Sequence, residues 1–471
     1  MKQPSETDPL SSTPPEAWDP LVRFAERARK PVDRFLHIEA ASGILLLIAA
    51  AVALLWVNSP FGASYTALWE TPLGIKIGEF TFERSLVWFV NDGLMVIFFF
   101  VVGLEIRREI HAGELSELRR AALPLFAALG GVLLPAGLYL ALAGAPETRS
   151  GWGVPMATDI AFAVGILTLL GKRVPPAMRV LLLAVAVIDD LCAIIVIAVF
   201  YSSGISMAGL AVGALGYAGV IAMQRFGVRS KLAYVAPTFV AWAGIYAAGI
   251  HPTIAGVIVG LLTPVRAWLG TEGFQIAARK QLDRLSGTPD EELSSYKVAG
   301  ILQRVDASRR EVLSPSAELI HTLHPWVAFG IMPIFALANS GVSLAGGAFD
   351  VSAWNIISGV TVGLVLGKTI GVLLASWLTL KLGICVLPRG MGLRHLLVLG
   401  IVAGVGFTMA IFIAQLAFQD EQLLSAAKLG VLVASGAAAV IGLIVGCLIL
   451  KPVDVPGAAK TGHEAESSTE V

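Results

Sequence analysis

The sequence predicts an all-α polytopic membrane protein. Of its 471 residues, 56% are hydrophobic and only 14% are charged, and the mean hydropathy is +0.77. Apolar stretches recur along the whole chain, many of them near the roughly twenty residues that a helix needs to cross a bilayer core about 30 Å thick. Lys and Arg together number 34, as do Asp and Glu. The overall charge therefore indicates no nucleic-acid partner.

Twelve apolar stretches are predicted to span the membrane. They occupy roughly residues 40–58, 87–108, 121–143, 150–170, 176–201, 207–223, 230–247, 250–263, 321–344, 357–381, 395–418 and 424–449. Lys and Arg concentrate in alternate connections, as the positive-inside rule requires. The basic connections are marked by Arg107, Arg108, Arg119 and Arg120, by Lys172, Arg173 and Arg179, by Arg225, Arg229 and Lys231, and by Lys381, Arg389 and Arg394. This alternation places both termini in the cytosol.

The spans divide the chain into five parts. We expect a cytosolic arm at 1–35, eight spans within 36–263, a cytosolic and partly helical linker at 264–320, four spans within 321–450, and a polar cytosolic tail at 451–471. The arm has no apolar core or cleavage site of a signal peptide. Apolar and polar residues alternate within 71–84, which predicts a small external β-hairpin. The three cysteines lack metal or redox spacing, so no disulfide is expected.

Asp189 and Asp190 lie side by side in the middle of the fifth span. A charge at the centre of a membrane helix costs roughly 2.5–3.5 kcal/mol, so such residues usually serve a function. A helix cap or a membrane-edge position would be the alternative, but about ten apolar residues flank the pair on each side. Successive helical residues differ by about 100° in direction. One carboxylate can therefore line an ion cavity while the other meets a partner.

Two further spans are predicted to be interrupted. Gly151, Gly153 and Pro155 precede Thr158 and Asp159, and Pro and Gly both weaken a helix. The alternative is an ordinary helix start that Thr158 caps. In the eleventh span Gly404 and Gly406 lead to Thr408, for which close helix packing through small residues is the alternative.

Lys368 lies deep in the tenth span. A buried ammonium group needs an anion or several carbonyl groups. Asp189 is the obvious candidate partner, and the alternative is that Lys368 extends to the membrane interface.

Several long motifs, in order along residues 36–450, resemble those of the NhaA-type sodium/proton antiporters. They are NDGLMVIFF with GLEIRRE, ATDIAFA, VIDDL, LHPWVAF with ANSGVSL, LGKTIG, and GVGFTMAIFIA. The resemblance implies inverted-topology repeats with two interrupted helices that cross near Thr158 and near Gly404 and Gly406, an architecture for which this family is an established example. Asp159 and Lys368 would balance the charges of the helix ends.

The resemblance also suggests functions for other residues. The family is regulated by pH, and candidates for the sensor are Glu105, Arg108, Glu109, His321 and His324. Pairing of these carboxylates with Arg107 or Arg108 is expected. Ile320 stands where the best-known member of the family has an acidic residue, with Glu318 two positions earlier, so the pH of activation stays open. Asp92 resembles a family carboxylate, although a helix-start role is equally compatible. The predicted hairpin at 71–84 resembles the segment through which two copies of the chain contact each other in this family, which implies a homodimer.

The predicted function is sodium/proton antiport across a bacterial cytoplasmic membrane. Sodium, or lithium, prefers the oxygen ligands that Asp189, Asp190, Thr158 and freed carbonyls supply, and protons compete for the same carboxylates. Because coupled groups titrate together, more than one proton can move per sodium ion, which makes the exchange electrogenic. Besides these ions, the expected partners are membrane lipid and a second copy of the chain. No cofactor and no enzymatic activity are expected.

Three other functions are compatible with paired aspartates in a membrane. An intramembrane aspartyl protease needs carboxylates that face one another across a water molecule, which adjacent residues of one helix cannot do. A channel would not need Lys368. A sodium-coupled symporter of an organic substrate is the strongest alternative, and it predicts further polar or basic residues near the middle of the membrane.

Overall fold

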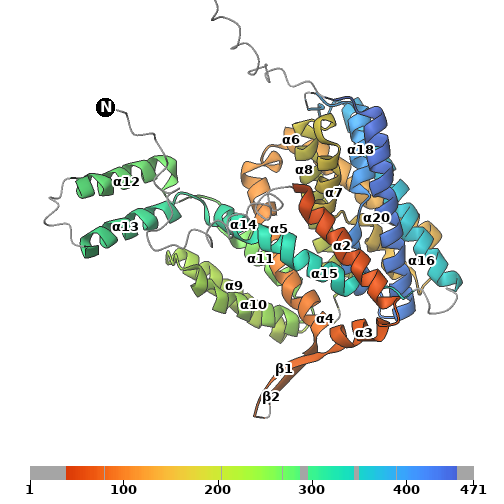
Figure 1. Ribbon diagram of the computed structural model, residues 1–471, viewed down its shortest axis with the longest axis horizontal. Helices are drawn as coiled ribbons and strands as arrows, with labels where there is room; N and C mark the ends of the chain where they lie inside the picture. Colours follow the sequence, from red (N-terminus) through yellow and green to blue (C-terminus); the bar gives the residue numbers. More distant parts are fainter. Residues whose placement is uncertain are drawn as a thin grey trace, which may run out of the picture.

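The computed structural model describes residues 39–452 except 79, 203, 268, 287–294, 344–349 and 389. The helices form a bundle from which a β-hairpin and a pair of helices project (Figure 1). The expected arm at 1–35 and nearly all of the expected tail lie outside the described residues.

The first half of the chain contains the hairpin and seven of the expected spans. Its elements are α2 (Glu39–Val57), α3 (Gly62–Glu70), β1 (Pro72–Ile77), β2 (Phe80–Ser85), α4 (Leu86–Trp88), η2 (Phe89–Leu94), α5 (Met95–Ala112), η3 (Glu114–Ser116), α6 (Leu118–Leu142), η4 (Arg149–Met156), α7 (Ile160–Leu169), η5 (Gly171–Arg173), α8 (Pro176–Phe200), α9 (Met207–Arg225), η6 (Lys231–Tyr234) and α10 (Val235–Ala247). β1 and β2 pair antiparallel, with Pro72 opposite Ser85 and Ile77 opposite Phe80. The alternation in the sequence therefore does form a hairpin.

The second half contains the remaining spans and the linker helices. Its elements are α11 (Thr253–Leu262), α12 (Gly270–Ser286), α13 (Ser295–Arg310), α14 (Pro315–Trp326), η8 (Val327–Ile331), α15 (Met332–Asn339), α16 (Val351–Val362), η9 (Gly363–Gly367), α17 (Lys368–Lys381), α18 (Leu393–Ala403), α19 (Phe407–Ala417) and α20 (Glu421–Ile449). Each range expected to cross the membrane contains a helix or several short ones, with different bounds at several ends.

Apolar helices dominate the described part of the chain. Seven are long and apolar enough to cross a membrane, or up to ten if each bent pair of helices counts as one span. The bend between η4 and α7 is 41°, and that between α18 and α19 is 47°. α2 and α3 meet at 113°. The protein is thus a mostly helical, multi-pass membrane protein with interrupted helices at the two expected places.

Capping residues start several helices earlier than hydropathy predicts. Ser314 accepts a hydrogen bond from the backbone N of Ala317 at 3.2 Å, and Pro315 occupies the first turn of α14. α14 therefore begins at Pro315 rather than at 321. Asp350 caps α16 and Asp420 caps α20 in the same way. These polar caps satisfy the free N–H groups of the first turn, so the helices extend beyond their apolar cores.

Three long helices contain a π-helical turn, η2, η8 or η9. Pro333 lies two residues after the end of η8 and lacks an N–H group, which explains the local change of hydrogen-bond register there. η9 ends immediately before Lys368, and η2 contains Asp92. Such turns are frequent at functional sites because they redirect side chains.

α6 and α17 pack closely because glycines meet at their crossing. A β-carbon at Gly371 would collide with the carbonyl group of Gly130. We expect Gly371→Ala to destabilise the protein by about 1–3 kcal/mol through overpacking. Thermal unfolding in detergent measures this loss. Gly137→Ala on α6 is the matched control, since nothing lies within 4 Å of a β-carbon there, and an undiminished melting temperature in Gly371→Ala would show that the crossing tolerates a side chain.

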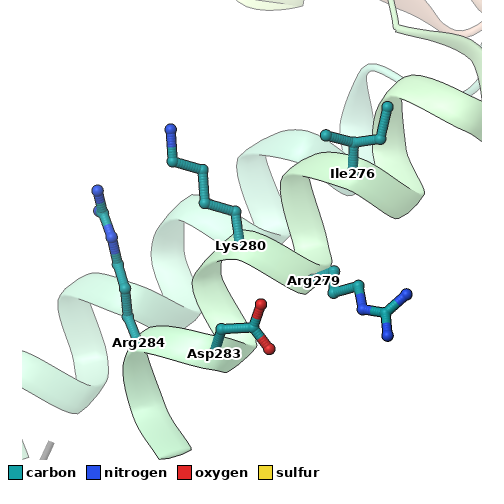
Figure 2. A pocket seen from close by; sticks show the side chains of 5 residues that line it. All are labelled: Ile276, Arg279, Lys280, Asp283 and Arg284. Atoms are coloured by element: carbon teal, nitrogen blue, oxygen red, sulfur yellow. The ribbon is translucent and has the colours of Figure 1, made fainter. Parts of the chain in front are cut away.

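α12 and α13 lie side by side, away from the bundle (Figure 1). An ion pair connects the end of α13 to the loop after α9, with Arg229 3.2 Å from Glu311. Nearby, Lys231 of η6 lies 2.6 Å from Glu318 of α14. A surface hollow of about 450 Å³ on α12 is lined by Ile276, Arg279, Lys280, Asp283 and Arg284. Figure 2 shows Lys280 and Arg284 reaching away from the helix. Because this hollow lies on the projecting helices, it is separate from the intramembrane carboxylates.

Candidate functional site

The two interrupted helices touch each other at their breaks. The backbone N of Asp159 donates a hydrogen bond to the carbonyl oxygen of Val405 at 2.8 Å. The Thr158 hydroxyl lies 2.9 Å from the carbonyl oxygen of Ala403. Each break therefore satisfies backbone groups that the other leaves free, which is how irregular backbone is tolerated inside a membrane protein.

Asp159 caps two helices at once. One carboxylate oxygen accepts a hydrogen bond from the backbone N of Phe162 at 3.0 Å, at the start of α7. The other oxygen accepts from the backbone N of Thr408 at 3.2 Å, and also from the Thr408 hydroxyl, at the start of α19. A negative charge between two helix N-termini is stabilised by both helix dipoles. Asp159 thus holds the ends of α7 and α19 together.

Lys368 forms an ion pair with Asp189 at the same place. The ammonium nitrogen lies 2.7 Å from Oδ2 of Asp189, and both side chains are fully buried. The ammonium also donates a hydrogen bond to the carbonyl oxygen of Met156, the last residue of η4. The cation therefore lies at a helix C-terminus, where a positive charge is stabilised.

Asp189 has one oxygen left without a hydrogen bond. The Thr158 hydroxyl, 2.8 Å from Oδ2, shares its single proton between this oxygen and the carbonyl of Ala403. Oδ1 of Asp189 is buried without a hydrogen-bond partner in the described structure. A buried acceptor of this kind costs free energy unless another group pairs with it.

Asp190 is buried, with 3% of its surface exposed. No hydrogen bond or ion pair to its carboxylate occurs within the described parts of the chain. Asp189, Glu105 and Asp159 all lie close enough to repel its charge, and Lys368 close enough to attract it. The expectation that one carboxylate meets a partner while its neighbour stays free agrees with this arrangement.

Gly404 and Gly406 lie at the second break, but neither has the positive φ that would require glycine. A β-carbon at Gly406 would lie 2.9 Å from Cβ of Ala410 and 3.1 Å from the carbonyl oxygen of Ala157. One at Gly404 would collide with the carbonyl group of Leu364. These glycines permit the close approach of the crossing segments at the predicted break, so close packing and interruption occur together.

The pH-sensor candidates lie near one end of α5, where α14 packs against it. Among the described residues no ion pair within 4 Å joins Glu105 or Glu109 to Arg107 or Arg108, although the charge of Arg108 attracts that of Glu105, so the expected network stays a prediction. Glu109 instead accepts a hydrogen bond from the backbone N of Glu114 at 2.6 Å, because the chain turns back after α5. His321 and His324 are both exposed on α14.

Asp92 has a partner that the sequence analysis missed. Its carboxylate lies 3.4 Å from Nε2 of His251, and Nδ1 of that ring lies 2.8 Å from the Thr253 hydroxyl. Since the helix begins at Leu86, Asp92 does not occupy a helix start. His251 precedes α11 by two residues, and no local pattern pointed to it.

Comparison with known proteins agrees with this geometry. The family model described as Na+/H+ antiporter 1 matches residues 33–445. The chain belongs to this family. It is 66% identical over 459 residues to the Na(+)/H(+) antiporter NhaA 2 of Myxococcus xanthus, with 98% of each chain covered. It is 55% identical over 465 residues to the protein of the same name from Sorangium cellulosum, covering 98% of this chain and 99% of the relative.

A solved structure is also similar, but with much lower sequence identity than these relatives. The sodium proton antiporter MjNhaP1 of Methanocaldococcus jannaschii matches with a TM-score of 0.45 and 11% identity, covering 90% of this chain and 99% of that chain. This likeness is too weak to carry an argument about the site. The resemblance seen in the sequence motifs is confirmed by the family match, and the family is one of transporters.

Proposed function

We propose that the chain exchanges sodium for protons across the bacterial cytoplasmic membrane, with Asp189 and Asp190 as the ion site. The observation that carries the proposal is the buried ion pair of Asp189 and Lys368 beside the unpaired Asp190 carboxylate. A site that only stabilised the fold would pair both carboxylates, because an unpaired buried charge is costly. Function in sodium/proton exchange is supported by the two NhaA 2 relatives.

Sodium is the transported substrate and binds to oxygen atoms. Oδ1 of Asp189, the Asp190 carboxylate and the Thr158 hydroxyl supply the oxygens that a hard cation prefers. The described residues hold no group of three or more His, Cys, Asp or Glu that could hold a metal ion. Such a sparse ligand set suits a transported ion, which must leave the site as readily as it enters.

Protons and sodium compete because both need the same carboxylates. A sodium ion at Asp189 weakens the attraction that holds Lys368 there, so the ammonium and the carboxylates titrate as one coupled group. More than one proton is then released for each sodium ion bound. Exchange follows if the site changes its orientation only when it carries sodium or protons.

The proposal extends to the arrangement of the chain in the membrane and to its pairing with a second copy. The short α10 and α11 complete twelve spans, the interrupted helices belong to inverted repeats, and both termini lie in the cytosol with the linker at 264–320. The hairpin lies outside and joins two copies of the chain. Neither cofactor nor enzymatic step is part of this function.

The proposal is tested in everted vesicles from bacteria that lack their own antiporters. Respiration acidifies the vesicle interior, and a pH-sensitive dye reports the collapse of the gradient on addition of sodium. Collapse at one or more pH values supports exchange. If sodium has no effect at any pH although membrane insertion is verified, symport of an organic substrate becomes the better explanation. Against symport, Lys368 is the only cation within ion-pair distance of Asp159, Asp189 or Asp190 among the described residues.

The same vesicles test the pH sensor. A histidine side chain can gain a positive charge within the physiological pH range, and His324 lies close enough to Arg108 for two such charges to repel. If that charge inhibits exchange, replacing both histidines with alanine should extend exchange to lower pH by about one unit. His111→Ala, at the same end of α5, is the control and should leave the pH profile unchanged. An identical profile in the double variant would remove these histidines from the sensor.

A further inference from the structure

One face of α19 connects the site to a buried layer of side chains. Thr408, Phe412 and Gln415 are spaced i, i+4 and i+7, so they lie along one face of this helix. Thr408 contacts Asp159 at the crossing. Gln415 lies seven residues further on, about 10 Å along the helix at 1.5 Å per residue.

Phe412 belongs to a buried aromatic layer that three helices form. Its ring centroid lies 5.3 Å from that of Phe99 on α5 and 6.2 Å from that of Phe335 on α15. All three rings are at most 3% exposed. These buried rings place apolar groups in contact between the three helices, where a hydrated ion would have to displace them.

An amide layer lies next to the aromatic layer and is built on the same helices. Asn339, on α15, exchanges hydrogen bonds with Asn91 of η2 at 2.8 and 3.3 Å. It also donates to the carbonyl oxygen of Phe335 at 2.9 Å and accepts from Gln415. These four bonds use both donors and both acceptor sites of the Asn339 amide, which is 1% exposed.

The helices that meet at these layers belong to different packing groups. α19 packs mainly against η4 and α20, and so moves with the interrupted helices. α5 packs mainly against α11 and α14, and α15 continues from α14 through η8. α2 packs against both α15 and α7, so it contacts both groups of helices. Only a small contact joins α15 to α19. The layers therefore lie where two groups of helices, or bodies, meet: α5, α9, α10, α11, α14 and α15 form one, and α19, η4 and α20 belong to the other.

The layers lie on the outer side of the ion site. Arg107 and Arg108 mark the cytosolic end of α5, and Asn91 precedes that helix. α19 begins at the crossing and ends at Ala417, in a connection with little positive charge. A route from Asp190 to the outer medium between these bodies must therefore pass both layers.

We propose that the aromatic layer of Phe99, Phe335 and Phe412 and the amide layer of Asn91, Asn339 and Gln415 form the outer gate of the ion site. This inference rests on the proposed antiport. The gate is closed in this structure, and the Gln415 bond to Asn339 breaks when α19 moves away with the interrupted helices. Because all hydrogen-bonding groups of the Asn339 amide are paired in the closed state, a partly open state would leave buried amide groups unpaired. Such intermediate states are high in free energy, so the gate is either closed or open.

Covalent locking of the gate is the test. Asn339→Cys and Gln415→Cys are combined in a chain whose three native cysteines are replaced, and a short bifunctional thiol reagent that reduction can cleave joins them. We expect cross-linking to slow sodium/proton exchange in vesicles at least about tenfold, because opening is obligatory for turnover. Cleavage of the link should restore the rate. Binding of sodium to the purified, locked protein should remain.

A matched cross-link within one body is the control. A β-carbon at Gly219 on α9 would lie 3.1 Å from Cβ of Pro237 on α10, so Gly219→Cys with Pro237→Cys can be linked without joining the two bodies. Exchange should continue in this linked control. Undiminished exchange in the fully linked 339–415 variant would overturn the gate. Absence of exchange in the unlinked, cysteine-free parent and in the wild type alike would instead overturn the proposed antiport.

Discussion

Replacing Asp190 with asparagine is expected to abolish sodium/proton exchange, lowering the rate at least about a hundredfold, as is typical when a positioned proton acceptor is lost. Asparagine keeps the shape of the side chain but can neither bind a proton reversibly nor neutralise sodium. Since Asp190 has no hydrogen bond within the described parts of the chain, the substitution breaks none of them. The melting temperature should therefore stay the same or rise, because a repulsive buried charge is removed.

This combination separates a transport role from a structural one. Exchange is measured by dye fluorescence in everted vesicles, and stability by thermal unfolding of the purified protein. Cys192→Ser, two residues along the same helix, is the control and should retain exchange. Asp190→Glu should retain part of the activity because it keeps a titratable group. Wild-type exchange rates in Asp190→Asn would exclude this carboxylate from the ion site.

Replacing Lys368 with methionine is expected to lower the free energy of unfolding by about 3–5 kcal/mol, the usual cost of removing one partner of a buried ion pair. The change leaves the Asp189 carboxylate without its cation and the carbonyl of Met156 without a donor. Removing the second charge as well, in Lys368→Met with Asp189→Asn, should recover most of the loss. A double-mutant cycle of melting temperatures measures the coupling.

The control for this cycle is Lys381→Met on the same helix. Within the part of the chain that the structure describes, Lys381 is exposed and lies 4.9 Å from the centre of the Trp377 ring, near the end of α17. An exposed contact of this type contributes about 0.5–1 kcal/mol, so the control should change stability little. If Lys368→Met were as stable as this control, or if the double variant were less stable than the single one, Lys368 and Asp189 would not be a coupled pair.

Hydropathy and the cost of buried charge predicted much of the site. The break at Thr158 was visible because glycine, proline and a carboxylate rarely share an apolar span, and the break near Gly404 because glycines cluster there. The partnership of Lys368 with Asp189 followed from the same cost, since an ammonium group in a membrane needs an anion. Both predictions rest on the large free-energy cost of an unpaired charge or backbone group inside a membrane. This cost excludes most arrangements of these residues, even when only the sequence is known.

Contacts between distant neutral groups could not be predicted in this way. Asn91 and Asn339 are 248 residues apart and form hydrogen bonds through their side-chain amides. A neutral amide can also lie on a polar surface, so nothing in the sequence indicated that these two side chains would pair. The pairing of Asp92 with His251 likewise depends on how α11 packs against α5. Helix starts at Pro315 and Val351 depended on caps outside the apolar stretches. The hydrogen bond from the backbone N–H of Glu114 to Glu109 likewise depends on the turn after α5, which the sequence did not indicate.

The most direct test of the account is proton release when sodium binds to the purified protein. The protein is placed in a weakly buffered detergent solution with a pH indicator, and sodium chloride or choline chloride is added at several pH values. We predict that sodium, but not choline, releases protons, and that Asp189→Asn combined with Asp190→Asn abolishes the release. Sodium binding that is detected by its heat but releases no protons at any pH would contradict competition of the two ions for this aspartate pair.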